Sequence, residues 1–238
     1  MEEKRKEVAI STKSSKFAAW FDNYWYHYKW ATIIGLFFSI VVIVCIAQSC
    51  TLERYDLMVS YAGNYLEEED KASIEFVLSS ALPDGFAEQE SPKCEFNSYL
   101  VLTKDQILEM EKETDADGNK VYVDSAFISS EQQTLINQIK TGQTSIYFID
   151  IEVYNSLFLN DDGTSDILMP LKDIFGETPN GSCDNYGILL GDTAMYKEYR
   201  GIRALPEDTV ICLAKKLYHQ SEDSYSLQVE AFKAFAKN

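Results

Sequence analysis

Only a few residues of this 238-residue chain have a type and a neighbourhood suited to catalysis. A Ser–His–Asp site would need His219, because the other histidine, His27, belongs to an aromatic run beside an apolar segment. His219 precedes a polar stretch, residues 220–224, that is typical of an exposed surface. The acidic residues at 67–70 and 161–162 fall in an expected helix start and an expected turn, where solvated carboxylates are common. We expect no catalytic residues, and the sequence lacks the motifs GxxxxGKS/T, GxGxxG, HExxH and GxSxG.

Residues 115–119 have the composition of a calcium-binding loop. An EF-hand loop needs glycine at its sixth position and an acidic residue at its twelfth. Counted from Asp115, the glycine is fourth and the twelfth residue is Ala126. A tight turn fits this stretch better, so we predict no metal site and no cofactor.

The five cysteines do not form a disulfide framework or a metal motif, since the sequence holds no CxxC and no Cys/His cluster. Cys45 lies in an apolar segment and Cys212 in a strand-like run, where each is expected to act as a small core residue. Cys94 and Cys183 remain as a pair that could form a disulfide.

The candidate ligand-binding residues stand where expected strands end. Ligands of open α/β sheets collect at the carboxyl ends of parallel strands. Gly63, Asn64 and Tyr65 follow the first expected strand, Thr103 follows the second and Asp150 follows the third. Each of these residues also has a simpler explanation as a turn residue or a helix cap, and the sequence leaves both explanations open.

The elements that must position these residues alternate between strand and helix along residues 55–238. Strands are expected at residues 56–60, closed by a turn at 61–64, and at 96–102, 145–149, 186–190 and 209–214. Helices are expected from Asn64 or nearby to Pro83, from Thr103 to about Glu113 with Gln106 completing a capping box, from Ser129 or Ser130 to Gly142, at 151–159 and at about 227–235, with a packed loop and short helix at 167–175. Strands separated by helices indicate an α/β fold with a small mixed, partly parallel sheet flanked by helices.

An apolar segment precedes this domain. Residues 31–49 carry no charge, and a helix of this length spans nearly the ~30 Å hydrocarbon layer of a membrane. We therefore expect a single transmembrane helix at residues 31–50. Six aromatic residues lie within residues 21–30 and are expected to form an interfacial helix that leads into the membrane.

Charge indicates the orientation of the chain. Residues 1–30 hold six Lys and Arg against four Asp and Glu, whereas acidic residues follow the apolar segment. The positive-inside rule then places residues 1–30 in the cytoplasm and the domain at 55–238 outside the plasma membrane. Some thirty residues precede the apolar core, which favours a retained anchor over a cleaved signal. Residues 47–50 resemble a lipoprotein cleavage site only loosely, which leaves lipidation of Cys50 as an alternative.

The order of segments resembles a known family. The strands DLMVS, FNSYLVL and SIYFID, followed by LMPL and YGILL, resemble the first lobe of extracellular solute-binding proteins of the sugar-binding kind, over about residues 55–213. The aromatic entry FDNYWYHYKW and the stretch LPEDTVICL are similar to uncharacterised membrane-anchored proteins of Gram-positive anaerobes. The first likeness implies ligand binding and the second implies a topology. About 184 residues suffice for one lobe, which cannot enclose a ligand as a two-lobed cleft does.

These observations predict a membrane-tethered, extracytoplasmic binding or interaction module without catalytic activity. Its expected partners are the lipid bilayer and either another envelope protein or a small solute. The alternative is a degenerate solute-binding lobe for a small ligand such as a sugar or a peptide. The net charge of −17 argues against nucleic acid as a partner, because phosphate backbones would be repelled.

Overall fold

The computed structural model describes residues 2–51, 55–88, 91–113, 120 and 122–237, and within the first helix it describes the side chains of residues 19–21 and 23–47. The predicted turn at 115–119 and the side chain of Cys50 lie outside the described residues. The chain divides into two compact units, residues 1–53 and residues 54–238. Each unit is described by itself.

The first unit is one helix, α1 (Glu2–Thr51). The most apolar 18-residue window of its stretch Asn23–Ala47 has a mean hydropathy of 2.7, and none of this window is buried. This stretch is long and apolar enough to cross a membrane.

The second unit is built on a five-stranded sheet in the order β2-β1-β3-β5-β4. The strands are β1 (Leu57–Gly63), β2 (Cys94–Leu100), β3 (Ile146–Ile149), β4 (Gly187–Leu189) and β5 (Val210–Leu213). β1 pairs in parallel with β2 and β3, whereas β5 is antiparallel to both β3 and β4. The prediction of a mixed, partly parallel sheet flanked by helices is therefore confirmed.

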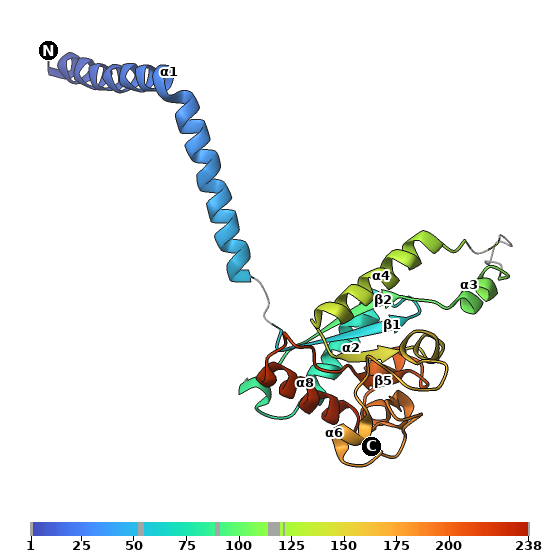
Figure 1. Ribbon diagram of the computed structural model, residues 1–238. Coiled ribbons are helices and arrows are strands. Elements are labelled where there is room, and N and C mark those ends of the chain that lie inside the picture. Colours follow the sequence, from blue (N-terminus) through green and yellow to red (C-terminus); the bar gives the residue numbers. More distant parts are fainter. Residues whose placement is uncertain (1, 52–54, 89–90, 114–119, 121, 238) are drawn as a thin grey trace. The chain divides into compact units, whose positions relative to one another are not determined.

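Helices cover both faces of the sheet, which explains why its central strands are apolar on successive residues. One face packs against α2 (Glu68–Ala81) and α8 (Glu222–Phe235). The other face packs against α4 (Ser125–Thr141) and α5 (Ile151–Val153). Figure 1 shows α4 on one side of β1 and β2, with α2 and α8 on the other side.

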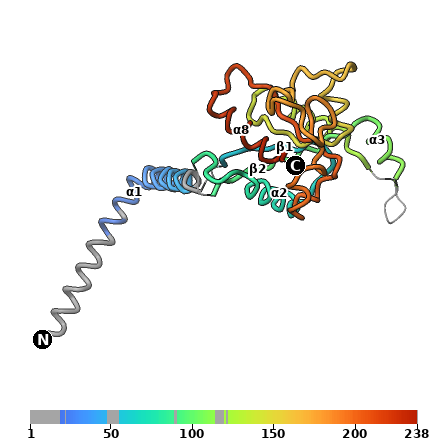
Figure 2. Tube along the Cα trace, turned by 90° about the horizontal axis from the view of Figure 1, so that it is seen from below, coloured from blue at the N-terminus to red at the C-terminus, as the bar shows by residue number. Residues whose placement is uncertain are grey.

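Short elements complete the domain. They are η1 (Phe86–Glu88), α3 (Lys104–Met110), the π-helical turn η2 (Tyr154–Phe158), α6 (Leu171–Phe175), η3 (Leu190–Asp192), α7 (Ala194–Glu198) and η4 (Arg200–Ala204). Figure 2 shows the segment around residue 200 beside α2. Gly201 permits this approach, because a Cβ there would lie 3.1 Å from the Ser73 carbonyl oxygen and 3.1 Å from Val77 Cγ2.

Two predicted boundaries were wrong. β1 continues through Gly63 instead of turning at residues 61–64, because Tyr61 and Ala62 still pair with β3. α2 accordingly begins after Glu67 and not near Asn64.

The predicted start of α4 was also wrong. The helix begins at Ser125, and the Asp124 carboxylate accepts hydrogen bonds from the backbone N–H groups of Ala126 (3.1 Å) and Phe127 (3.0 Å). Ser129 cannot cap it, since its hydroxyl donates back to the Ser125 carbonyl within the helix. The predicted end at Gly142 is confirmed, and this glycine has the left-handed conformation of a C-cap (φ 62°).

A Cys94–Cys183 disulfide does not form, and both cysteines are free. Cys94 lies in β2 and Cys183 precedes β4, which are the two opposite edge strands of the sheet. With neighbouring strands about 4.8 Å apart, the two edges are far beyond the ~7 Å Cα separation that a disulfide can bridge.

Candidate functional site

The predicted residues Thr103 and Asp150 belong to one hydrogen-bonded network. Thr103 and Gln106 form the expected capping box. The Thr103 hydroxyl accepts from the backbone N–H of Gln106 (3.2 Å), and the Gln106 side-chain carbonyl accepts from the backbone N–H of Thr103 (2.8 Å). Asp150 Oδ1 accepts from the N–H groups of Glu152 (3.0 Å) and Val153 (3.3 Å), and from Gln106 Nε2 (3.1 Å). Both residues therefore cap helices, and Gln106 joins the two caps.

The residues that follow β1 have different roles. Gly63 is enclosed, because a Cβ at this position would lie 2.7 Å from Tyr61 Cζ and 3.0 Å from Asp150 Cβ. Asn64 and Tyr65 are exposed. Gly63, Asn64 and Tyr65 do not line either of the two cavities described below.

A polar cavity of about 770 Å³ lies near the carboxyl ends of β2 and β3. Thr103 is the one predicted site residue that lines it. The other lining residues come from the segment between β2 and α3 and from α3, α4, α5 and η2: Leu102, Lys104, Asp105, Gln132, Glu152, Val153, Asn155, Ser156 and Leu157.

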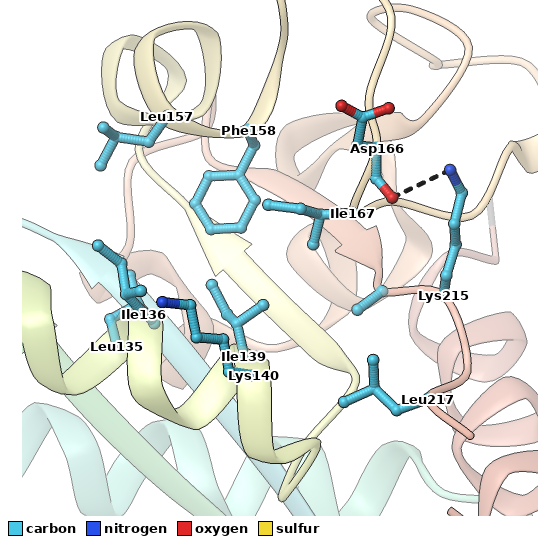
Figure 3. A pocket seen from close by; sticks show the side chains of 11 residues that line it. Leu135, Ile136, Ile139, Lys140, Leu157, Phe158, Asp166, Ile167, Lys215 and Leu217 are labelled. Atoms are coloured by element: carbon cyan, nitrogen blue, oxygen red, sulfur yellow. Dashed lines mark hydrogen bonds between the residues drawn. The ribbon is translucent and has the colours of Figure 1, made fainter. Parts of the chain in front are cut away.

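A second pocket, of about 340 Å³, is almost entirely apolar. Figure 3 shows Leu157 and Phe158 of η2 on one side, facing Leu135, Ile136 and Ile139 of α4. The remaining lining residues are Lys140, Asp166, Ile167, Ala214, Lys215 and Leu217. Leu157 lines both cavities, so the polar cavity and the apolar pocket lie side by side.

Two local features of the chain form walls of this pocket. Leu135 of α4 is buried against the sheet, whereas Ile136 and Ile139 beside it are only half-buried and face the pocket. The third side is fixed by backbone pairing, because the Lys215 N–H donates to the Ile167 carbonyl (2.7 Å) next to a Leu168–Ala214 bridge.

The sequence predicted Leu135, Ile136 and Ile139 only as part of the helix that ends at Gly142. The signal for a site is that Ile136 and Ile139 remain partly exposed while apolar. That signal is structural, because periodicity alone does not show whether a helix face meets another element or an opening.

Three charged residues lie at the rim of the apolar pocket, and their side chains differ in orientation and in hydrogen bonding. Lys215 Nζ donates to the backbone carbonyls of Ser165 (3.0 Å) and Asp166 (3.1 Å). The Asp166 carboxylate points away from the apolar side chains in Figure 3, so Asp166 meets Lys215 through its backbone carbonyl. Lys140 is exposed in the last turn of α4 and makes no ion pair among the described residues.

A buried polar cluster next to β4 fixes η2 in place. The Tyr154 hydroxyl donates to the Asp184 carboxylate (2.9 Å to Oδ2), which also accepts from the N–H groups of Tyr186 (2.7 Å) and Gly187 (2.9 Å). Burial raises the pKa of Tyr154 and of the nearby Cys212 thiol well above their ordinary values. Both groups therefore stay protonated at neutral pH, which suits a structural role.

Within the described ranges, no three His, Cys, Asp or Glu side chains are grouped to hold a metal ion. The geometry of the domain supports binding of an apolar group beside a polar cavity. Comparison of the chain with protein-family models, curated proteins and solved structures gives no match.

Proposed function

We propose that this chain is a membrane-tethered, extracytoplasmic binding module without catalytic activity, whose domain accepts an apolar group in the α4–η2 pocket. The observation that carries the proposal is an open pocket of about 340 Å³ lined mostly by aliphatic and aromatic side chains. Its size falls at the lower end of the range for small-molecule sites, about 300–1,000 Å³. Each methylene buried there would contribute roughly 0.8 kcal/mol of transfer free energy.

The membrane part of the proposal rests on α1 and on charge. The apolar stretch of α1 supports an anchor, and the excess of basic residues before it supports a cytoplasmic N-terminus. The acidic residues after it support an external domain.

The second candidate is a degenerate solute-binding lobe for a sugar or a peptide. The adjoining polar cavity favours it, because Gln132, Asn155 and Ser156 offer both donors and acceptors. A lobe of this kind would bind its ligand in the open cavity and leave the apolar pocket empty.

Orientation is tested with a protease-sensitive tag after Asn238. We expect protease added to intact cells to remove the tag, because the domain lies outside. The matched control is the same tag before Met1, which should be cleaved only after the cells are opened. Protection of the C-terminal tag in intact cells would contradict the proposed topology.

Binding is tested by thermal unfolding of residues 55–238, which contain the whole described core. Octanol at ten times its dissociation constant should raise the midpoint by about 3–6 °C, since such an excess stabilises the folded state by about 1.4 kcal/mol. Leu157→Asn should abolish this shift, whereas Leu108→Asn should retain it. Leu108 is an exposed leucine of α3 that does not line the pocket. A shift with sugars or peptides but none with octanol would favour the solute-binding lobe instead.

A further inference from the structure

Two ammonium groups border the apolar pocket, although the chain holds 38 Asp and Glu against 21 Lys and Arg. They come from separate elements: Lys140 from the end of α4, and Lys215 from the segment that follows β5. Asp166 is the one acidic residue that lines the pocket, and its carboxylate is directed away from it. The rim is thus locally cationic in an acidic protein.

The Lys215 ammonium retains the capacity to bind an anion. A lysine ammonium has three N–H donors, and the carbonyls of Ser165 and Asp166 take two of them. These two hydrogen bonds hold the half-buried side chain in one place. A fixed, partly desolvated cation binds an anion more strongly than a solvated one does.

We propose that the pocket binds a small amphiphilic carboxylate. Its aliphatic or aromatic body would lie between Leu135, Phe158 and Ile167, and its carboxylate would accept a hydrogen bond from Lys215, with Lys140 adding attraction at the rim. This proposal rests on the proposed binding function and names the class of ligand. A cationic amphiphile would meet two ammonium groups, and a neutral one would offer Lys215 no charge with which to form an ion pair.

The experiment uses the full chain in lipid nanodiscs with isotope-labelled isoleucine δ1 methyl groups. Ile136, Ile139 and Ile167 line the pocket, whereas Ile74 and Ile202 lie in the core on the far face of the sheet and serve as internal controls. The probes are octanoate, octanol and octylammonium, which share a chain length and differ in charge. We expect octanoate to shift the three pocket methyls and to bind about tenfold more tightly than octanol, with octylammonium weakest.

Substitutions of single lysines then test which ammonium group attracts the carboxylate of octanoate. Lys215→Met should weaken octanoate binding about tenfold and leave octanol binding unchanged, because methionine keeps most of the aliphatic stem. Lys140→Met should weaken it about twofold to fivefold, as expected of an exposed charge. Lys233→Met, on α8 at the other face, is the matched control and should have no effect.

The outcomes separate this inference from the function on which it rests. Equal affinity for octanoate and octanol, or octanoate binding that Lys215→Met does not change, would overturn the inference while leaving an apolar binding pocket. If none of the probes shifts Ile136, Ile139 or Ile167, the pocket itself is not a binding site. A Lys215→Met variant that loses octanol as well would show that Lys215 only maintains the pocket shape, which also overturns the inference.

Discussion

Tyr61 and Tyr147 are fully buried tyrosines of the neighbouring strands β1 and β3, but their hydroxyl groups differ. The Tyr147 hydroxyl donates to the Thr144 carbonyl at 2.9 Å. The Tyr61 hydroxyl has no hydrogen-bond partner of ordinary geometry among the described residues, although the backbone of Asn64 lies close to it. A buried polar group without a partner costs stability, so the two residues should respond oppositely to loss of the hydroxyl.

We predict that Tyr61→Phe raises the free energy of unfolding by about 1 kcal/mol, because it removes an unpartnered polar group. Tyr147→Phe should lower it by about 1 kcal/mol, because the Thr144 carbonyl then loses its donor. Urea unfolding of residues 55–238, followed by circular dichroism, measures both. Destabilisation by Tyr61→Phe as large as that by Tyr147→Phe would show that the Tyr61 hydroxyl is satisfied.

Hydrogen bonds and contacts of single residues also show the structural roles of the predicted ligand-binding residues. Asp and Thr directly after strands occur both in ligand sites and as helix caps, and sequence cannot separate the two roles. The Asp150 carboxylate and the Thr103 hydroxyl accept hydrogen bonds from backbone N–H groups in the first turns of α5 and α3. This is the helix-cap role that the sequence offered as the simpler explanation. Gly63 is needed for packing against Tyr61 and Asp150, a contact that arises only once the strands are paired.

At the scale of elements, a buried polar contact joins α4 to the sheet. The Ser60 hydroxyl of β1 donates to Gln138 Oε1 at 2.8 Å, and both residues are buried. The contact lies beside the apolar cluster that includes Leu135. It therefore fixes how α4 sits on β1, and with it one wall of the pocket.

We predict that Ser60→Ala and Gln138→Leu each destabilise the domain by about 1–3 kcal/mol, because each leaves a polar partner or a packing mismatch in the core. The double variant should cost less than the sum of the two, since both partners are then apolar. A double-mutant cycle by urea unfolding measures the coupling. Simple additivity would mean that the hydrogen bond does not orient α4.

Sequence analysis located all five strands and the main helices because their signals are local and strong. β3 and β5 are buried on every residue, which makes them short continuous apolar runs. The start of α4 was missed because several serines compete with Asp124 as caps, and only the packing of the helix decides between them. The apolar pocket was missed because four separate segments of the chain, around residues 136, 158, 167 and 215, form it together.

At the scale of the whole molecule, the domain carries its buried tyrosines and cysteines as neutral groups. Burial raises the pKa of Tyr225 from 10.0 to about 12, and its hydroxyl donates to the Ala214 carbonyl at 2.8 Å. Burial likewise raises the pKa of Tyr61 and of Tyr147. Because the unfolded chain ionises first, it binds fewer protons than the folded chain above pH 9–10. Stability is therefore complete below this range and falls as pH rises through it.

Tyr225→Phe tests this alkaline linkage. At pH 8 the variant should be less stable than wild type by about 1 kcal/mol, because a buried hydrogen bond is lost. Near pH 11 the difference should vanish. This pH is one unit above the pKa of 10.0 of Tyr225 in the unfolded chain, so ionisation of the unfolded chain lowers the stability of wild type by about 1.4 kcal/mol. Urea unfolding at both pH values measures this, with Tyr218→Phe, an exposed tyrosine, as the control. A constant difference at the two pH values would contradict the linkage.

The π-helical turn η2 has one further consequence. A π turn holds one residue more than an α-helical turn, and this surplus sets the directions of Leu157 and Phe158. Deleting a single residue such as Asn155 would tighten the turn and rotate the side chains after it by about 100°. Phe158 would leave the pocket wall, while Tyr154 before the deletion could keep its bond to Asp184. A one-residue deletion in η2 would thus change which ligands the pocket accepts, although the residue types that line the pocket in wild type are all still present in the chain.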